Sequence, residues 1–252
     1  MNTQLRHSVP TVLTQINFFS PRERNVPWKQ TRGAFPMRST LLSAAAVLSA
    51  MTAPAAAEQG DLLVRLRGIM VAPNEDSGPV MPAFPTGTVS VDNAIVPELD
   101  FTYFLTNNIG VELILATSPH DVSGEDALAP LGEIVDAMVL PPTLTLQYHF
   151  APDAAFRPYV GAGVNYTMFY DTDAKTALTD AIGPTDVSMD DSFGWAVQAG
   201  FDIPITERVF FNADVKYIDI DTTATLTTGA LVNEVDVDID PFVFGIGVGM
   251  RF

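Results

Sequence analysis

The chain of 252 residues contains no cysteine, so it can form neither a disulfide framework nor a thiolate metal site. Beyond its N-terminal region it also has no run close to the ~20 continuous apolar residues that a membrane-spanning helix needs. The mean hydropathy is nevertheless +0.21, which is high for a soluble protein. The apolar residues must therefore be spread along the chain by alternation with polar ones.

The N-terminal region has the features of a targeting sequence. Arg32 and Arg38 precede an apolar stretch, Leu41–Ala50, and the small residues Ala55–Ala57 follow it. This order of charge, apolar stretch and small residues predicts a cleaved signal peptide at residues 37–57. We therefore expect the protein to be exported.

Basic residues are scarce once this segment is removed. Residues 1–57 hold six basic residues and one acidic residue, so the mature chain keeps 13 − 6 = 7 Lys and Arg and 30 − 1 = 29 Asp and Glu, a net charge of −22. Such a surface excludes nucleic acid as a partner. Met37 is a plausible start, which makes residues 1–36 an upstream extension, and the alternative is a genuine cytoplasmic arm. Residues 58–252 are then one domain.

The C-terminal strand carries two faces that do not suit a protein in water. One face holds only large apolar side chains: Phe242, Phe244, Ile246, Val248, Met250 and Phe252. The opposite face holds Gly245, Gly247, Gly249 and Arg251. In a closed membrane barrel the first face meets lipid and the second lines the lumen. The terminal aromatic, Phe252, resembles the signal that the outer-membrane barrel-assembly machinery of Gram-negative bacteria recognises.

Eight segments share this strand character, and the connections between them alternate between long and short. The segments are Asp61–Pro73, Ala94–Leu105, Ile109–Thr117, Val139–Phe150, Arg157–Tyr170, Ser192–Ile203, Val209–Ile220 and Val237–Phe252. Short periplasmic turns, long outer loops and an even strand number are typical of outer-membrane barrels. The sequence thus predicts an all-β fold, an eight-stranded antiparallel up-and-down transmembrane barrel. A soluble lipocalin-like barrel, the alternative, would leave inward-facing acidic residues such as Glu98 on its outside.

Alternation also assigns the residues that line the lumen. The periplasmic half receives charged side chains of both signs: Arg65, Arg67, Glu98, Asp100, Glu112, Asp202, Asp214, Lys216 and Arg251. Isolated charges in a narrow lumen of low dielectric cost several kcal/mol each, so near balance of sign predicts an ion-paired network. We expect this network to obstruct a straight aqueous path.

The outer half of the lumen is predicted to be apolar. Its inward positions are Ile69, Val71, Val96, Ile114, Phe169, Ile218, Ile220, Ile239 and Val243. At the same height outward positions become acidic, which indicates that the barrel continues beyond the bilayer. An apolar funnel open to the outside is a site for small hydrophobic molecules. The alternative is that the loops fold in and form a dry core.

Prolines suggest a second property of the wall. Pro97, Pro141, Pro142 and Pro241 each remove a ladder donor from an otherwise regular strand. A wall weakened at Pro141 and Pro142 predicts a lateral exit into the membrane. The alternative is that these prolines only end strand pairing above the bilayer.

The long connections carry two further signals. Leu131, Ile134, Val135 and Met138 repeat at helical spacing, and Leu178, Ala181 and Ile182 do so less clearly, so short helices are expected there. Acidic residues on the last two strands, Asp219, Asp221, Asp238 and Asp240, suggest either a solvated rim or carboxylates that share divalent cations with lipopolysaccharide.

Several segments together resemble the OmpW family of outer-membrane proteins. They are Asp61–Pro73, Leu140–Phe150, Phe156–Tyr166, Lys216–Thr223 and Phe242–Phe252. The resemblance covers essentially the whole mature chain. It implies an eight-stranded barrel whose hydrophobic channel is closed toward the periplasm, and a role in the passage of small hydrophobic compounds.

Catalysis has little support in the sequence. Only His120 and His149 remain after processing. A triad is recognised by geometry rather than by sequence neighbours such as Ser118 and Ser123. His120 is expected in a loop beside Asp121, where a histidine is ordinarily solvated. We expect no enzyme activity, no cofactor and no metal. The predicted function is a porin-like outer-membrane channel for small hydrophobic solutes, in contact with outer-membrane lipid and lipopolysaccharide. The alternative is a closed structural or adhesive barrel, in which the protein's own side chains fill the outer half of the lumen.

Overall fold

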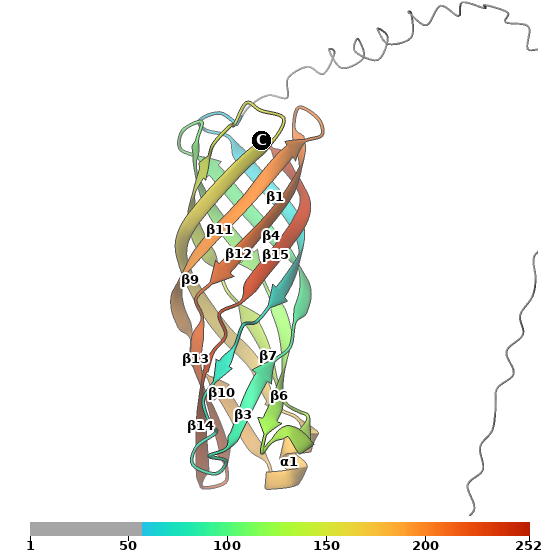
Figure 1. Cartoon of the computed structure of the whole chain (residues 1–252), viewed down its shortest axis with the longest axis vertical. Coiled ribbons are helices and arrows are strands. Elements are labelled where there is room, and N and C mark those ends of the chain that lie inside the picture. The colour runs from blue at the N-terminus through green and yellow to red at the C-terminus, as the bar shows by residue number, and fades with distance from the viewer. Residues whose placement is uncertain (1–56) are drawn as a thin grey trace, which may run out of the picture. The chain divides into compact units, whose positions relative to one another are not determined.

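The computed structural model describes residues 57–252, which fold into a closed antiparallel β-barrel (Figure 1). The predicted signal peptide and upstream extension fall on residues 1–56 and so lie outside the described residues, except for Ala57. That residue packs with Leu63, Phe104 and Phe210 at one end of the barrel.

Eight strands close the barrel in the order β11-β12-β15-β1-β4-β5-β8-β9, and β9 pairs back with β11. These strands are β1 (Leu62–Ala72), β4 (Ala94–Phe104), β5 (Ile109–Ala116), β8 (Thr143–His149), β9 (Arg157–Ala174), β11 (Ser192–Pro204), β12 (Val209–Ile218) and β15 (Phe242–Arg251). All neighbours are antiparallel. The predicted fold class is confirmed, and the alternation places the inward and outward faces as expected.

The long connections are not irregular loops, because they form further strands that extend the wall. These strands are β2 (Asp76–Ser77), β3 (Gly87–Val91), β6 (Ser118–Asp126), β7 (Glu133–Leu140), β10 (Thr185–Met189), β13 (Asp221–Thr228) and β14 (Leu231–Asp238). We call this part the outer tier; it lies at the bottom of Figure 1, beyond the ends of the barrel strands. The short turns, which mark the periplasmic end, lie with the C-terminus at the top.

The outer tier contains two short helical pieces, η1 (Ala129–Leu131) and α1 (Thr176–Ile182). The helix expected around Leu178 is therefore present, with Leu178 buried. The helix expected from Leu131 to Met138 is wrong beyond its first residue, since Ile134, Val135 and Met138 lie in β7. Pairing of β7 with both β6 and β9 overrides the helical spacing.

The outer surface of the barrel is apolar at the level of the expected bilayer. Ile95 is 81% exposed, Phe193 72% and Ile246 64%, and aromatic side chains such as Trp195 and Phe242 gather toward the outer end of this band. This pattern fits strands that face lipid. No helix among the described residues is long and apolar enough to cross a membrane.

Candidate functional site

The lumen has two parts that differ in chemistry, and the periplasmic half is filled by paired charges. Arg65 is fully buried and donates through Nη1 to Asp100 Oδ1 at 3.0 Å and to Thr102 Oγ1 at 2.8 Å. Its Nη2 donates to Asp202 Oδ2 at 3.1 Å, from the far side of the barrel. Arg65 therefore ties β1 to β4 and β11 across the lumen.

Arg67, two residues further along the same face of β1, extends this arrangement. Its guanidinium lies 2.6 Å from Glu98 Oε1, 2.9 Å from Asp100 Oδ2 and 2.8 Å from Asp214 Oδ2. Lys216 completes the group, with Nζ 3.1 Å from Glu98 Oε1 and 2.9 Å from Asp214 Oδ2. Each cation therefore has more than one carboxylate partner, which compensates the cost of its burial.

Most of the predicted polar residues thus form one buried ion-pair network. Its members are Arg65, Arg67, Lys216, Glu98, Asp100, Glu112, Asp202 and Asp214. Glu112 also accepts from Thr145 Oγ1 at 2.9 Å. Arg251 was placed in this network from the sequence, but it instead lies at the periplasmic end, 3.4 Å from Asp61 Oδ2.

On the periplasmic side of the ion-pair network, aromatic rings close the lumen. Phe104, His149 and Tyr159 pack in series, with ring centroids 4.8 and 5.1 Å apart. The Arg65 guanidinium carbon lies 5.4 Å from the Tyr159 ring centroid and 5.5 Å from that of Phe210. The sequence analysis missed Phe104, Tyr159 and Phe210 as lumen residues, although each has the inward parity of its strand.

The outer half of the lumen holds two apolar cavities among the described residues. The inner chamber, next to the network, has a volume of about 60 Å³, and the outer chamber beyond it about 40 Å³. A cavity that holds a single water needs roughly 10–15 Å³, so the space is not closely packed core. Val91, Val122, Met189 and Ile239 line both chambers and lie between them.

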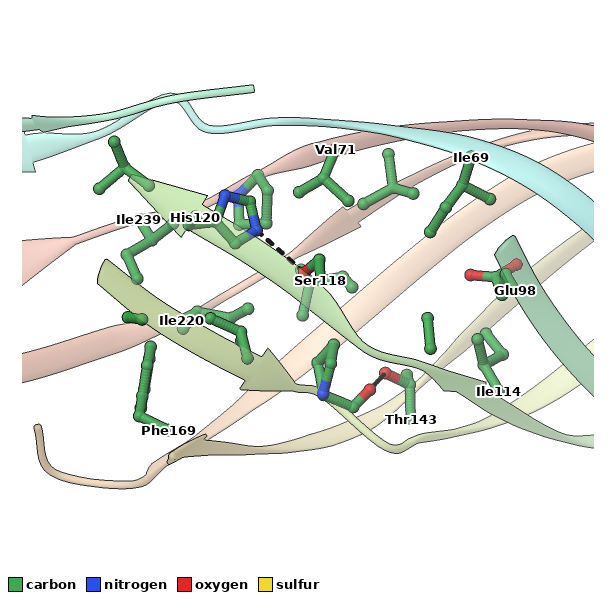
Figure 2. Close-up of a pocket in the computed structure, with 18 of the residues that line it drawn as sticks. Ile69, Val71, Glu98, Ile114, Ser118, His120, Thr143, Phe169, Ile220 and Ile239 are labelled. Carbon is green, nitrogen blue, oxygen red and sulfur yellow. Dashed lines mark hydrogen bonds between the residues drawn. The ribbon is translucent and has the colours of Figure 1, made fainter. Parts of the chain in front are cut away.

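The predicted apolar residues surround this space. The inner chamber is lined by Ile69, Val71, Ile114, Phe169, Ile218, Ile220, Ile239 and Val243 (Figure 2). Val96 is buried in the same apolar cluster without lining the chamber. The outer chamber is covered by residues that the sequence analysis did not assign to the lumen, among them Phe84, Leu128 and Leu178. They lie in the outer tier, whose pairing could not be derived from strand alternation.

Four polar side chains line the inner chamber: Glu98, Ser118, His120 and Thr143. His120 was expected in a solvated loop, but it is 8% exposed and lies on the inward face of β6. Its Nε2 is 2.9 Å from Ser118 Oγ (Figure 2). Its Nδ1 is 2.9 Å from the backbone oxygen of Asp92. Burial lowers the pKa of His120 below its usual 6.5.

The wall beside the inner chamber is interrupted at Pro141–Pro142. Pairing of β5 with β8 ends at Ile114 and Thr143, and pairing of β6 with β7 resumes at Ser118 and Val139. Within residues 57–252, no backbone ladder pairs the strands between these two points. We call this interruption the proline seam; Pro141 itself lines the inner chamber.

One side-chain bond crosses the outside of the seam. The Thr117 hydroxyl, on the β5 and β6 side, lies 2.6 Å from the Tyr170 hydroxyl on β9. By contrast the break at Pro241 is closed by the backbone, because the Ile218 amide donates to the Pro241 carbonyl at 3.3 Å. Pro97 pairs with Gly68 within the ladder of β1 and β4, whereas on its other side the ladder of β4 and β5 ends at Glu98 and Ala116.

Comparison with known proteins identifies the family. Residues 58–252 match the OmpW family. The chain belongs to this family. Outer membrane protein W of Vibrio cholerae is 38% identical over 220 residues, which cover 86% of this chain and 100% of the relative. The crystal structure of the outer membrane protein OprG from Pseudomonas aeruginosa superposes with a TM-score of 0.73 at 34% identity, covering 78% of this chain and 98% of OprG.

A more distant relative has an informative name. The dibenzothiophene metabolism operon protein PahQ of Pseudomonas aeruginosa is 28% identical over 172 residues, which cover 67% of this chain and 76% of that protein. OmpW-family proteins are barrels of the Gram-negative outer membrane without enzymatic activity, and their surroundings are lipid. The predicted family and the expected absence of catalysis are thereby confirmed.

The exterior of this OmpW-family barrel is acidic in the outer tier. Lys175 Nζ lies 2.7 Å from both Asp121 and Asp136, and 2.8 Å from Glu133, so it joins β6, β7 and the start of α1. These contacts raise the pKa of Lys175. Asp238 pairs in register with Asp221 and with Asp76 on either side. Some loss of hydration, together with the nearby carboxylates of Asp240, Asp221 and Asp76, raises the pKa of the exposed Asp238.

Proposed function

We propose that this barrel admits small hydrophobic molecules into the apolar outer half of its lumen and releases them sideways into the membrane at the proline seam. The observation that carries the proposal is the inner chamber: an apolar cavity on the outer side of a packed network of buried charges. Pockets of this composition bind apolar ligands. The alternative of a closed structural or adhesive barrel would fill that space with side chains.

The ion-pair network explains why a solute would not continue straight toward the periplasm. The lumen is spanned by Arg65, Arg67 and Lys216. The aromatic rings of Phe104 and Tyr159 pack on the periplasmic side of these residues. An apolar molecule in this region would separate paired charges without replacing their interactions, which is costly in a medium of low dielectric. The inner chamber is therefore the end of the axial path for such a molecule.

The proline seam supports a sideways route. It lies in the wall of the inner chamber and has no backbone ladder to break, so opening it costs less than opening a paired strand. We propose that its outer side faces lipid, where an apolar solute is soluble, because the exposed apolar side chains of Leu115 and Leu144 flank it. We propose that separation of the Thr117 and Tyr170 hydroxyls accompanies passage.

The apolar lining of the inner chamber and the name of one relative together suggest a class of solute. The name of the relative PahQ places that protein in an operon for the metabolism of dibenzothiophene, a flat aromatic compound of low polarity. We propose the same broad class for this chain: alkanes, terpenes and aromatic hydrocarbons that fit an apolar chamber. Lipopolysaccharide is proposed as the neighbour of the acidic outer tier.

Uptake by intact cells tests this proposal. Cells expressing the wild type are expected to take up members of such a panel faster than cells without the barrel. Ile114→Asp places a charge in the inner chamber and should abolish that gain, while Ile114→Leu, the matched apolar control, should retain it. Heat-modifiable migration on gels verifies that each variant is folded. Equal uptake with and without the barrel would favour the closed scaffold.

Phe252 is proposed as the signal for the barrel-assembly machinery. It ends the lipid-facing row of β15, is 68% exposed, and its backbone is held by pairing with Leu62. Phe252→Ser is expected to reduce the amount of folded barrel in the outer membrane without altering the refolding of purified protein in detergent. A control at the same face, Met250→Ser, should reduce assembly less.

A further inference from the structure

The hydrogen bonds of His120 and Ser118 in the inner chamber determine which atom donates and which accepts. Asp92 offers a backbone carbonyl to His120 Nδ1 at 2.9 Å, and a carbonyl can only accept. His120 Nδ1 must therefore carry the proton. In a neutral imidazole the other nitrogen, Nε2, is then an acceptor, so the Ser118 hydroxyl donates to it across 2.9 Å.

The neutral state of His120 is favoured by its position. It is 8% exposed and lines an apolar chamber, which disfavours the imidazolium. Asp121, the adjacent residue, faces outward and forms an ion pair with Lys175. The lowered pKa of His120 agrees with this geometry.

Donation to His120 leaves Ser118 as an acceptor. A hydroxyl has one proton and two lone pairs, and the proton of Ser118 is directed at Nε2. Among residues 57–252, no group donates a hydrogen bond to Ser118 Oγ, although the residue lines the chamber and is 4% exposed. The lone pairs of Ser118 Oγ are therefore available to accept a hydrogen bond from a molecule in the chamber.

The other polar groups of the chamber offer no free donor. The Thr143 hydroxyl donates to the Pro141 carbonyl at 3.0 Å and accepts from Asn165 Nδ2 at 2.9 Å. Glu98 is an acceptor, held by Arg67 and Lys216 through Oε1. The polar side chains of the inner chamber thus offer hydrogen-bond acceptors but no available donors.

We propose that the inner chamber selects hydrophobic molecules that carry a single hydrogen-bond donor, such as aliphatic alcohols and phenols, and that it holds them by donation to Ser118 Oγ. This inference rests on the proposed function and narrows its solute class. A molecule with only an acceptor, such as an ether, leaves its own oxygen and the lone pairs of Ser118 Oγ without a donor, which is the costly case in a dry site. The Ser118 and His120 pair acts here in binding, because Nδ1 faces a carbonyl rather than a carboxylate.

Three solutes of equal heavy-atom number separate the possibilities: 1-octanol, its isomer 1-methoxyheptane, and nonane. Initial uptake rates into intact cells are measured for each, after subtraction of cells without the barrel. The wild type is expected to favour 1-octanol over the isomeric ether by about threefold to tenfold, the range for one net hydrogen bond. Nonane reports entry that requires no hydrogen bond.

Variants of the two residues make the test specific. Ser118→Ala alone leaves His120 Nε2 as a free acceptor, so the deciding variant combines Ser118→Ala with His120→Leu and removes both acceptors. This double variant should lower 1-octanol uptake to the rate of the ether and leave the ether and nonane unchanged. Ser118→Thr keeps the hydroxyl and should keep the preference. His120→Leu frees the Ser118 proton to donate, so it should raise ether uptake toward that of the alcohol. Ser90→Ala, which removes a hydroxyl bonded to Glu125 on an exposed part of β3, is the matched control.

The outcomes distinguish this inference from the function on which it rests. Barrel-dependent uptake of all three solutes, with the same alcohol-to-ether ratio in the wild type and in the double variant, overturns the inference and leaves the conduit intact. Absence of barrel-dependent uptake for all three overturns both. A loss of all uptake in both the double variant and Ser118→Thr assigns Ser118 to folding and also overturns the inference.

Discussion

The two halves of the lumen are built on the same faces of the same strands, yet they have opposite chemistry. Along β1 the inward positions change from Arg65 and Arg67 to Ile69, and along β12 they change from Lys216 to Ile218. The periplasmic half is packed and ion-paired, whereas the outer half contains apolar space. Strand alternation thus determines which residues face the lumen. The residue type at each height determines whether the lumen is filled by ion pairs or contains apolar space.

The largest expected effect comes from breaking the ion-pair network. Arg67→Met removes the partner of Glu98, Asp100 and Asp214 and leaves buried carboxylates uncompensated. Loss of one member of a buried ionic group typically destabilises by about 3–5 kcal/mol. Urea unfolding in detergent micelles measures this, with Arg208→Met, at an exposed position, as the control. A similar loss in both variants would mean that the network does not stabilise the barrel.

Adding one or two carbons to each half sharpens the comparison. A Cβ at Gly247 would collide with the backbone of Leu66 and Arg67 in the packed half. Gly247→Ala is therefore expected to destabilise by roughly 1–3 kcal/mol, as overpacking does. Ala137→Val adds two carbons beside the inner chamber and should change stability less. The same unfolding assay compares them, and equal costs would show that the outer half is as closely packed as the periplasmic half.

Weakening the closure of the proline seam tests the route out of the outer half. Tyr170→Phe removes the hydroxyl that bonds Thr117 across the seam. Uptake of an apolar solute is expected to rise by roughly twofold to fivefold, which corresponds to a hydrogen bond of up to about 1 kcal/mol. Tyr166→Phe, on the same strand and face, loses a bond to Asp191 away from the seam and is the control. If both variants raise uptake equally, the seam is not the exit.

The smallest effect is expected on the acidic exterior. Asp238 faces Asp221 and Asp76, and its raised pKa means that the folded protein binds this proton more tightly than the unfolded chain. Charge on Asp238 therefore opposes folding at pH 7, and this penalty disappears as the pH falls through its folded pKa. Asp238→Asn should stabilise the barrel at pH 7 by about 0.2–1 kcal/mol, as for other opposed like charges. Thermal unfolding at pH 7 and pH 3 would show a gain only at the higher pH.

Sequence reasoning was most successful where lipid imposes a strict period of two. The terminal strand from Phe242 to Phe252 shows its faces directly, and the same parity places Arg67 and Asp214 in the lumen, where they lie 2.8 Å apart. The same parity also turns the rings of Phe104 and Tyr159 inward, although the sequence analysis did not assign them to the lumen.

The outer tier was predicted less well. Ile134 and Val135 have helical spacing but lie in β7, because neighbouring strands supply backbone partners that a short helix could not match. His120 was expected in solvent, and only the pairing of β6 with β3 and β7 turns it inward. Local sequence carries no information on which distant strand a loop segment will pair with.

The sequence by itself determined the barrel, its lipid and lumen faces, and the division of the lumen into charged and apolar halves, because alternation is a local property of each strand. The tertiary structure decided that Arg251 pairs with Asp61, that the wall lacks a ladder at Pro141–Pro142, and that Ser118 meets His120 inside the inner chamber. These features depend on register between strands and on the volume left between side chains, and both arise only when the barrel closes.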